Sequence, residues 1–339
     1  MSDMHPRRRR LGLWVVLGLF VVVAVGWSAV WWTAKTRVEQ ALADFRGSPA
    51  ARNLAWREAA VGGWPFRLRI ELRDARATFG DGAGVGAPRL VASAYVYQPG
   101  RWYAEAPDGL VLLRPISGDV DVRGRVRASL TDALGAQPRL AVEGRQLTLT
   151  PRPGAEPFLF DTIASFDLEA VKGPPQTDEA ALLWRLGGGR GRPGGLLTFI
   201  GAGGVASARL DLLIGRVSQF TGPDGAAAAR RWSGAGGTVR VRELNLQAGE
   251  TAAQARDGVL SVAEDGRLQG RLPVTLTRGA RALVGLTQVD SVNQPAAAGA
   301  AAMTEAASGD DGRMAAPVRF EGGRTFLGPF PIGPAPKFF

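Results

Sequence analysis

The strongest hydrophobic pattern in the chain is an uninterrupted apolar run near its N-terminus. Residues 11–32 read LGLWVVLGLFVVVAVGWSAVWW and contain no charged residue. As a helix rising about 1.5 Å per residue, this run is long enough to span the roughly 30 Å hydrocarbon core of a membrane. Arginines occupy positions 7–10, whereas acidic residues dilute the positive charge that follows the run. Because positive charge is retained on the cytoplasmic side, the pattern predicts a cytoplasmic tail at residues 1–10, a transmembrane anchor at 11–32 and the remaining chain outside.

A cleaved signal peptide is the alternative interpretation of this run. The apolar core of such a peptide usually spans about 7–15 residues and ends at small residues. Ala24-Val25-Gly26 resembles a cleavage site, but the uncharged stretch continues to Trp32 and no Ala-x-Ala sequence follows. Trp27, Trp31 and Trp32 would form an aromatic belt at the outer membrane boundary. The length and this bulky end favour an uncleaved anchor.

A helical pattern continues directly after the anchor. Val38, Leu42 and Phe45 recur at spacings of four and three, which is the period of one helix face. Gly47-Ser48-Pro49 then interrupts the pattern. We therefore predict a helical stalk over residues 33–49.

From about residue 54 the dominant period changes to two. Apolar side chains alternate with charged ones over residues 66–73, and residues 120–130 repeat the alternation. Shorter alternating runs, bounded by Gly, Pro or Asp, follow at residues 140–150, 210–217, 239–246, 259–262, 268–276 and 318–320. Strict alternation is typical of antiparallel strands with one apolar and one solvated face. The predicted fold is mainly β: residues 50–339 form one domain built on a long curved antiparallel sheet, half-barrel or taco-like, with one or two helices.

Two segments of this domain have helical character. Residues 178–186 read DEAALLWRL, with acidic residues at the start and an arginine near the end, as the helix dipole favours. Residues 278–292 are the second candidate. Residues 294–316 are small, polar and aperiodic, which predicts a mobile loop within the domain.

The composition excludes most catalytic chemistry. The chain has no Cys, and its one His, His5, precedes the anchor, so neither a thiolate nor an imidazole serves the β domain. We therefore predict no enzymatic activity, no cofactor and no metal site. The acidic pairs Asp119/Asp121 and Glu264/Asp265 are the remaining candidates for acid–base chemistry or cation binding, but neighbouring acids in strands and hairpins are usually solvated.

Basic residues outnumber acidic ones, and most of them are arginines. Two rows on the alternating strands could face lipid phosphates or other anionic glycolipids, although a solvated strand face is favoured; they are Arg67, Arg69 and Arg73, and Arg123, Arg125 and Arg127. Gly187–Gly195 (GGGRGRPGG) resembles an RGG segment that binds nucleic acid. Outside a membrane we interpret it as a loop between a helix and a strand, and no nucleic-acid partner is expected. Gly82–Gly86 lacks the Gly-x-Gly-x-x-Gly spacing of a nucleotide loop and is predicted to be a flexible turn.

Two short segments resemble a known protein family. Gly62-Gly63-Trp64-Pro65-Phe66 follows the anchor, and Phe326–Pro334 ends with Gly328-Pro329 and Gly333. Both segments resemble motifs of domain-of-unknown-function family 2125, and more distantly the plan of an anchor and an extended sheet is similar to AsmA-type proteins. The family resemblance implies an uncharacterised Gram-negative envelope protein with no established activity. The AsmA likeness implies a curved sheet that carries lipid in a groove.

A structural role is expected for the motif residues. Gly62 and Gly63 supply backbone freedom, and Pro65 lies at a strand entry, where its missing N–H is tolerated. Trp64 and Phe66 are expected to pack on the inner face of the sheet.

These observations lead to one expected function and one alternative. The protein is expected to be anchored in the inner membrane by a single helix, with its N-terminus in the cytoplasm and its main domain in the periplasm. There it would bind phospholipid or another apolar ligand on the concave face of the sheet. The alternative is a structural or protein-assembly partner in the envelope, which binds another protein by adding a strand at the sheet edge.

Overall fold

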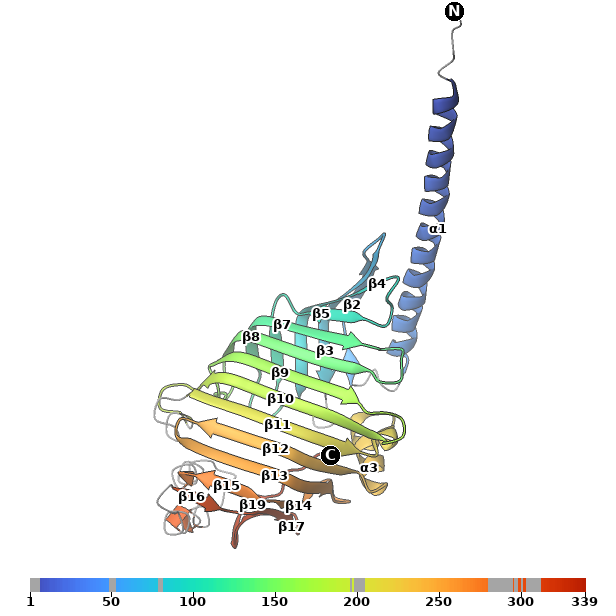
Figure 1. Cartoon of the computed structure of the whole chain (residues 1–339). Coiled ribbons are helices and arrows are strands. Elements are labelled where there is room, and N and C mark those ends of the chain that lie inside the picture. The colour runs from blue at the N-terminus through green and yellow to red at the C-terminus, as the bar shows by residue number, and fades with distance from the viewer. Residues whose placement is uncertain are drawn as a thin grey trace, which may run out of the picture.

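The computed structural model describes residues 7–48, 53–78, 82–195, 197, 205–279, 295, 298–299, 301–302 and 312–339. Helix α1 runs from Arg7 to Arg46 without a break, so the predicted anchor and stalk form one helix. The Gly47 N–H then closes the last turn on the Asp44 carbonyl oxygen, 3.1 Å away. Figure 1 shows the N-terminal half of α1 projecting beyond the rest of the molecule.

Helix α1 is long and apolar enough to cross a membrane, and a signal sequence near an N-terminus can have the same length and composition. Apolar side chains of its middle turns face outward, with exposed fractions of 64% for Leu19, 69% for Phe20 and 67% for Val22. Such a surface is unfavourable in water and suited to lipid.

All strands of the described residues belong to one antiparallel sheet, which confirms the prediction of a mainly β, antiparallel fold. The strands are β1 (Leu54–Ala55), β2 (Glu58–Gly62), β3 (Arg67–Thr78), β4 (Gly84–Tyr95), β5 (Trp102–Glu105), β6 (Leu110–Leu113), β7 (Val120–Thr131), β8 (Arg139–Pro151), β9 (Thr162–Lys172), β10 (Glu179–Arg190), β11 (Val205–Gly215), β12 (Thr238–Ala248), β13 (Thr251–Val262), β14 (Leu268–Leu272), β15 (Val274–Thr277), β16 (Arg313–Ala315), β17 (Val318–Glu321), β18 (Arg324–Leu327) and β19 (Phe330–Pro334).

The sheet is a meander in which strands pair with their neighbours in the chain. β7 to β13 each pair with the next strand. Short strands share a neighbour: β1 and β2 both pair with β3, and β5 and β6 both lie between β4 and β7. In Figure 1 the first strands lie beside α1, and the later strands follow progressively further from its N-terminal end.

The two faces of the central strands differ in chemistry, as the alternation predicts. One face carries ion pairs between adjacent strands: Arg145 to Asp167 at 2.7 Å, Arg185 to Glu169 at 2.7 Å, and Arg209 to Glu243 at 2.9 Å. The opposite face carries one apolar residue per strand in register across β8 to β12. We call these residues the apolar row: Val142, Leu168, Trp184, Leu210 and Leu244. All five are only half-buried.

Residues with positive φ lie where the register of two long strands shifts. The register shifts between Arg123 and Arg125 in β7, where Gly124 has φ 134°, and between Leu186 and Gly189 in β10, where Gly188 has φ 62°. Such bulges bend a strand and increase its twist.

Two closely packed clusters lie on the apolar face. One joins β12 to β15 with Trp232 of helix α3 (Gly225–Gly234). The other joins β7 to β10 and includes Phe158 and Phe160 from the segment between β8 and β9. The apolar row lies between the two clusters: Leu210 and Leu244 pack against the first, and Trp184 packs against the second.

The predicted helix at residues 178–186 is wrong, because the segment is the first part of β10. Its charges would suit a helix dipole, but the segment pairs with β9 on one side and β11 on the other, and this pairing stabilises the strand more than the charges stabilise a helix. The candidate helix at 278–292 lies outside the described residues beyond Gly279. The predicted loop at 294–316 is also largely outside them, but its last part forms β16, paired with β15. Helix α3 was not predicted.

Candidate ligand-binding cavity

An apolar cavity of about 900 Å³ lies at one end of the apolar face. Its walls come from distant parts of the chain: the first strands supply one side, and β11 to β14, α3 and the last residues supply the other. The lining residues are Asn53, Ala77, Thr78, Ile214, Val217, Phe220, Gly225, Ala226, Ala229, Trp232, Val239, Leu260, Ser261, Val262, Leu268, Phe338 and Phe339. Only Asn53, Thr78 and Ser261 bring polar side chains, so the cavity suits a hydrocarbon chain.

Helix α3 forms one wall of this cavity and is fastened at both ends. The carboxylate of Asp224 caps its first turn by accepting a hydrogen bond from the Ala227 N–H at 2.8 Å. Near its C-terminal end, Trp232 is 6% exposed, and its indole N–H donates to the Gly215 carbonyl oxygen at 2.7 Å. The alanines between these anchors, Ala226 and Ala229, leave space that larger side chains would fill.

The short helix η2 (Val217–Gln219) forms the adjoining wall. Asp178, at the start of β10, accepts hydrogen bonds from the Ser218 hydroxyl and N–H, each at 2.8 Å. These hydrogen bonds, the hydroxyl first, lower the pKa of Asp178 from its ordinary value because they stabilise its charged form. An ionised carboxylate therefore holds Val217 and its neighbours at the cavity.

A polar cavity of about 770 Å³ adjoins the apolar one and shares Val262 and Phe339 with it. Its lining includes two arginines, Arg230 and Arg267, together with Glu264 and Asp265. The Arg230 guanidinium lies 5.6 Å from the Phe339 ring centroid. An apolar space beside a polar one with arginines matches the two parts of an amphiphile.

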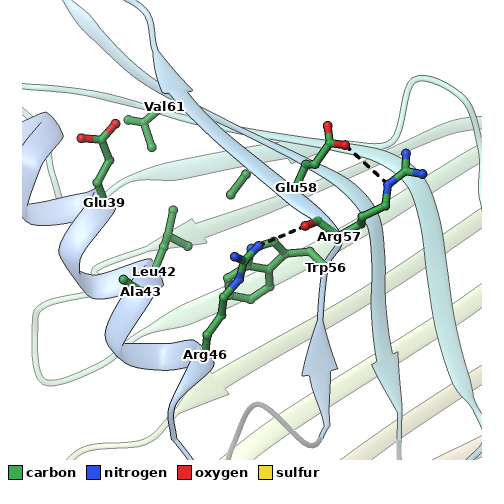
Figure 2. Close-up of a pocket in the computed structure, with 9 residues that line it drawn as sticks. Glu39, Leu42, Ala43, Arg46, Trp56, Arg57, Glu58 and Val61 are labelled. Atoms are coloured by element: carbon green, nitrogen blue, oxygen red, sulfur yellow. Dashed lines mark hydrogen bonds and ion pairs between the residues drawn. The ribbon is translucent and has the colours of Figure 1, made fainter.

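A third cavity, of about 390 Å³, lies between the end of α1 and the first strands, as Figure 2 shows. Trp56 stacks on Phe45 with ring centroids 5.7 Å apart, and the Arg46 guanidinium donates to the Arg57 carbonyl oxygen at 3.2 Å. The Trp56 indole N–H is buried and has no hydrogen-bond partner among the described residues. These contacts attach the stalk to the sheet, and the charged lining does not suit an apolar ligand.

The glycine-aromatic-proline motif forms a turn between β2 and β3. Gly63 has φ 102°, and a Cβ there would lie 2.7 Å from the Arg67 carbonyl oxygen, which explains the glycine. Trp64 and Pro65 are joined by a cis peptide bond. The expectation that Trp64 and Phe66 pack on the sheet is wrong, because their exposed fractions are 59% and 58%.

The C-terminal motif also forms a turn. Gly328 has φ 56° and lies with Pro329 between β18 and β19, while Gly333 pairs with Thr325 in the last hairpin. None of these three residues lines the apolar cavity. Gly333 lines only a separate polar hollow near Arg324.

The acidic pairs that the sequence singled out are engaged in ordinary surface contacts. Asp119 and Asp121 both pair with Arg152, at 3.5 and 2.8 Å. Asp265 accepts a hydrogen bond from the Arg267 backbone N–H at 3.0 Å, as in a turn. The arginines of both rows are exposed.

Two glycine-rich segments are strands rather than loops. Gly84 to Gly86 belong to β4, so the predicted flexible turn is limited to the residues before them. Gly187 to Arg190 belong to β10, which corrects the predicted loop at 187–195 in its first half. In both segments glycine lets a neighbouring strand approach closely: a Cβ on Gly187 would lie 2.6 Å from Ser165 Oγ.

Comparison with known proteins gives one match. Residues 27–336 match the model of a family described as an uncharacterized protein conserved in bacteria, DUF2125. No curated protein and no solved structure matches the chain significantly.

Proposed function

Because the chain belongs to the DUF2125 family, which carries no described activity, we propose a function from its own geometry: it is a membrane-anchored, non-catalytic envelope protein that binds a lipid or another apolar ligand. In this proposal α1 crosses the inner membrane with the N-terminus in the cytoplasm, and the sheet lies in the periplasm. The arginines at positions 7–10 support the orientation.

The apolar cavity beside α3 is the observation that carries this proposal. Its volume of about 900 Å³ is within the range of small-molecule sites, roughly 300–1,000 Å³. Its apolar walls favour an acyl chain, and the adjoining polar cavity places Arg230 and Arg267 where an anionic headgroup would lie.

The shape of the sheet supports the same proposal. Ala77 and Thr78 of β3 line the cavity together with Val239 of β12, although many strands separate β3 from β12 in the sheet. A sheet that curls would bring them together, and the bulges in β7 and β10 favour such bending. The half-buried apolar row would then line the same trough.

The edges of the sheet do not favour the alternative function, in which another protein adds a strand at the sheet edge. At one edge α1 contacts β2, and a covered edge does not accept another strand readily. Far from α1, the described part of the sheet ends in two strands with one partner each, β16 and β19. Of these, β19 contains Pro331 and Pro334, which have no N–H to donate to an added strand.

Photolabelling of the full chain in phospholipid nanodiscs tests the proposal. A palmitic acid analogue that carries a diazirine on its acyl chain should label peptides that line the cavity, in particular residues 217–239. Ala229→Trp places an indole in the cavity and should reduce this labelling. Arg231→Trp adds the same ring at an exposed position of α3 that does not line the cavity, and it should label like the wild type.

Equal labelling of the Ala229→Trp variant and the wild type, or labelling confined to α1, would contradict the cavity as a lipid site. The assembly function would then be the better explanation, and it predicts a protein partner in cross-linked envelope preparations.

A further inference from the structure

Three large aromatic side chains form an exposed cluster where the sheet begins. Trp64 and Phe66 belong to the turn between β2 and β3, and Tyr97 follows β4; their exposed fractions are 59%, 58% and 59%. The Val96 N–H donates to the Phe66 carbonyl oxygen at 3.1 Å, so the two turns are adjacent. We call Trp64, Phe66 and Tyr97 the aromatic cluster. Large apolar side chains that are exposed together are more often part of an interaction surface than ones that are exposed singly.

Helix α1 holds this cluster at a defined height. The Trp27 indole N–H donates to the Pro65 carbonyl oxygen at 2.8 Å, and the Trp31 indole N–H donates to the Arg67 carbonyl oxygen at 2.8 Å. The rings of Trp27 and Phe66 lie 6.1 Å apart. Trp31 is 5% exposed, so this junction is closely packed.

Along the helix axis, the junction lies near the outer end of the apolar run. Trp27 lies five residues before the end of the run at Trp32, or about 7–8 Å along the helix axis. Trp32 itself is 58% exposed, and beyond it Lys35 pairs with Glu39 in the polar stalk. The turn between β2 and β3 is therefore level with the last apolar turns of α1.

We propose that the aromatic cluster inserts into the headgroup region of the outer leaflet, so that the sheet is fixed to the lipid surface at a second point besides α1. Indole and phenol rings favour this region because they have an apolar body and a polar group. Arg67 lies 4.8 Å from the Tyr95 ring centroid and donates to the Tyr95 hydroxyl at 2.7 Å, which places a cation beside the lipid phosphates. The inference rests on the proposed anchoring by α1.

Insertion would give the sheet a fixed orientation on the bilayer. A single helix alone leaves a domain free to tilt, whereas two contacts, at α1 and at the aromatic cluster, keep the first strands against the membrane. Lipid leaving the bilayer would then meet the apolar face at its first strands.

Single-cysteine variants of the full chain test the insertion, because the chain has no native Cys. Trp64→Cys and Tyr97→Cys, each labelled with bimane, are reconstituted in nanodiscs of phosphatidylglycerol and phosphatidylcholine, with or without bromine on the acyl chains. Both labels should lose emission in the brominated lipid. Val259→Cys, which replaces a 50% exposed side chain of β13, should not.

Leu19→Cys, in the middle turns of α1, separates the two proposals. Loss of emission at positions 19, 64 and 97 supports the insertion. Loss at position 19 alone overturns the insertion and leaves the anchor intact. No loss at position 19 overturns both the anchor and the insertion.

Discussion

Individual glycines decide where neighbouring strands can approach each other. Gly84 starts β4 opposite Thr78, at the end of β3. A Cβ at this position would lie 2.0 Å from the Ala77 carbonyl oxygen and 2.8 Å from the Thr78 Cα. Both contacts involve backbone atoms, so the strands themselves would have to separate. The strand end that would separate carries Ala77 and Thr78, which line the apolar cavity.

Gly84→Ala is therefore expected to lower the free energy of unfolding by about 1–3 kcal/mol, the range typical of overpacking that forces a backbone shift. Gly62→Ala is the matched control, since a Cβ there would meet nothing within 4 Å, and it should change stability by no more than about 0.5 kcal/mol. Urea unfolding of the full chain in detergent, followed by circular dichroism, measures both. Equal midpoints for the two variants would show that the strands accommodate the methyl group.

At the scale of elements, α3 is the piece that closes the apolar end of the sheet. It is short, but Trp232 packs with Val241, Leu260 and Leu272 of three different strands. The hydrogen bond of its indole to the Gly215 carbonyl oxygen joins it to the end of β11. The helix is thus held by tertiary contacts rather than by its own propensity, as expected for ten residues.

Replacing this tryptophan should separate packing from hydrogen bonding. Trp232→Ala is expected to cost about 3–5 kcal/mol, because it leaves a void in the cluster. Trp232→Phe keeps most of the apolar area but leaves the Gly215 carbonyl oxygen unpaired, and it should cost about 1–3 kcal/mol. Trp102→Ala serves as the control, since the hydrogen bond of its indole to Pro99 is exposed. A Trp232→Ala variant no less stable than Trp102→Ala would contradict the anchoring role of α3.

The whole molecule has one apolar helix at its start and a meander that leads away from it. Successive strands pair with their neighbours, so most contacts of the sheet form between segments close in the chain. The N-terminal half of α1 projects beyond the sheet (Figure 1), so a membrane around it leaves the whole sheet on one side. The proposed topology decides which side that is.

Alkaline phosphatase fused after Phe45 should be active, since the enzyme folds only outside the cytoplasm. Replacing the four arginines at positions 7–10 with glutamate removes the charge asymmetry, and this control should reduce the activity. Green fluorescent protein at the same point should stay dark when exported in unfolded form. If the phosphatase fusion is inactive and the green fluorescent protein fusion is fluorescent, the sheet faces the cytoplasm.

Features with a local signal could be predicted from the sequence alone. An uncharged run of 22 positions has the length of a membrane-spanning helix, and it forms part of α1. Strict alternation predicted β3, β7, β8 and β12, because successive side chains of a strand point to opposite faces. The face chemistry followed directly, with ion pairs on one side and the apolar row on the other.

The remaining features depend on contacts between residues far apart in the chain, which no local pattern shows. Residues 178–186 have a helix-like charge pattern, yet pairing with β9 and β11 makes most of them part of a strand. β4 contains Pro88, which lies opposite the positive-φ residue Asp74 at a position left out of the pairing between β3 and β4, so the missing N–H of the proline is tolerated inside the sheet. The cavity joins residues 53–78 with residues 214–339, and Trp64 is exposed because α1 binds the backbone of its turn rather than its ring. No local pattern encodes such distances, since they depend on how many strands separate two residues and on how the sheet bends.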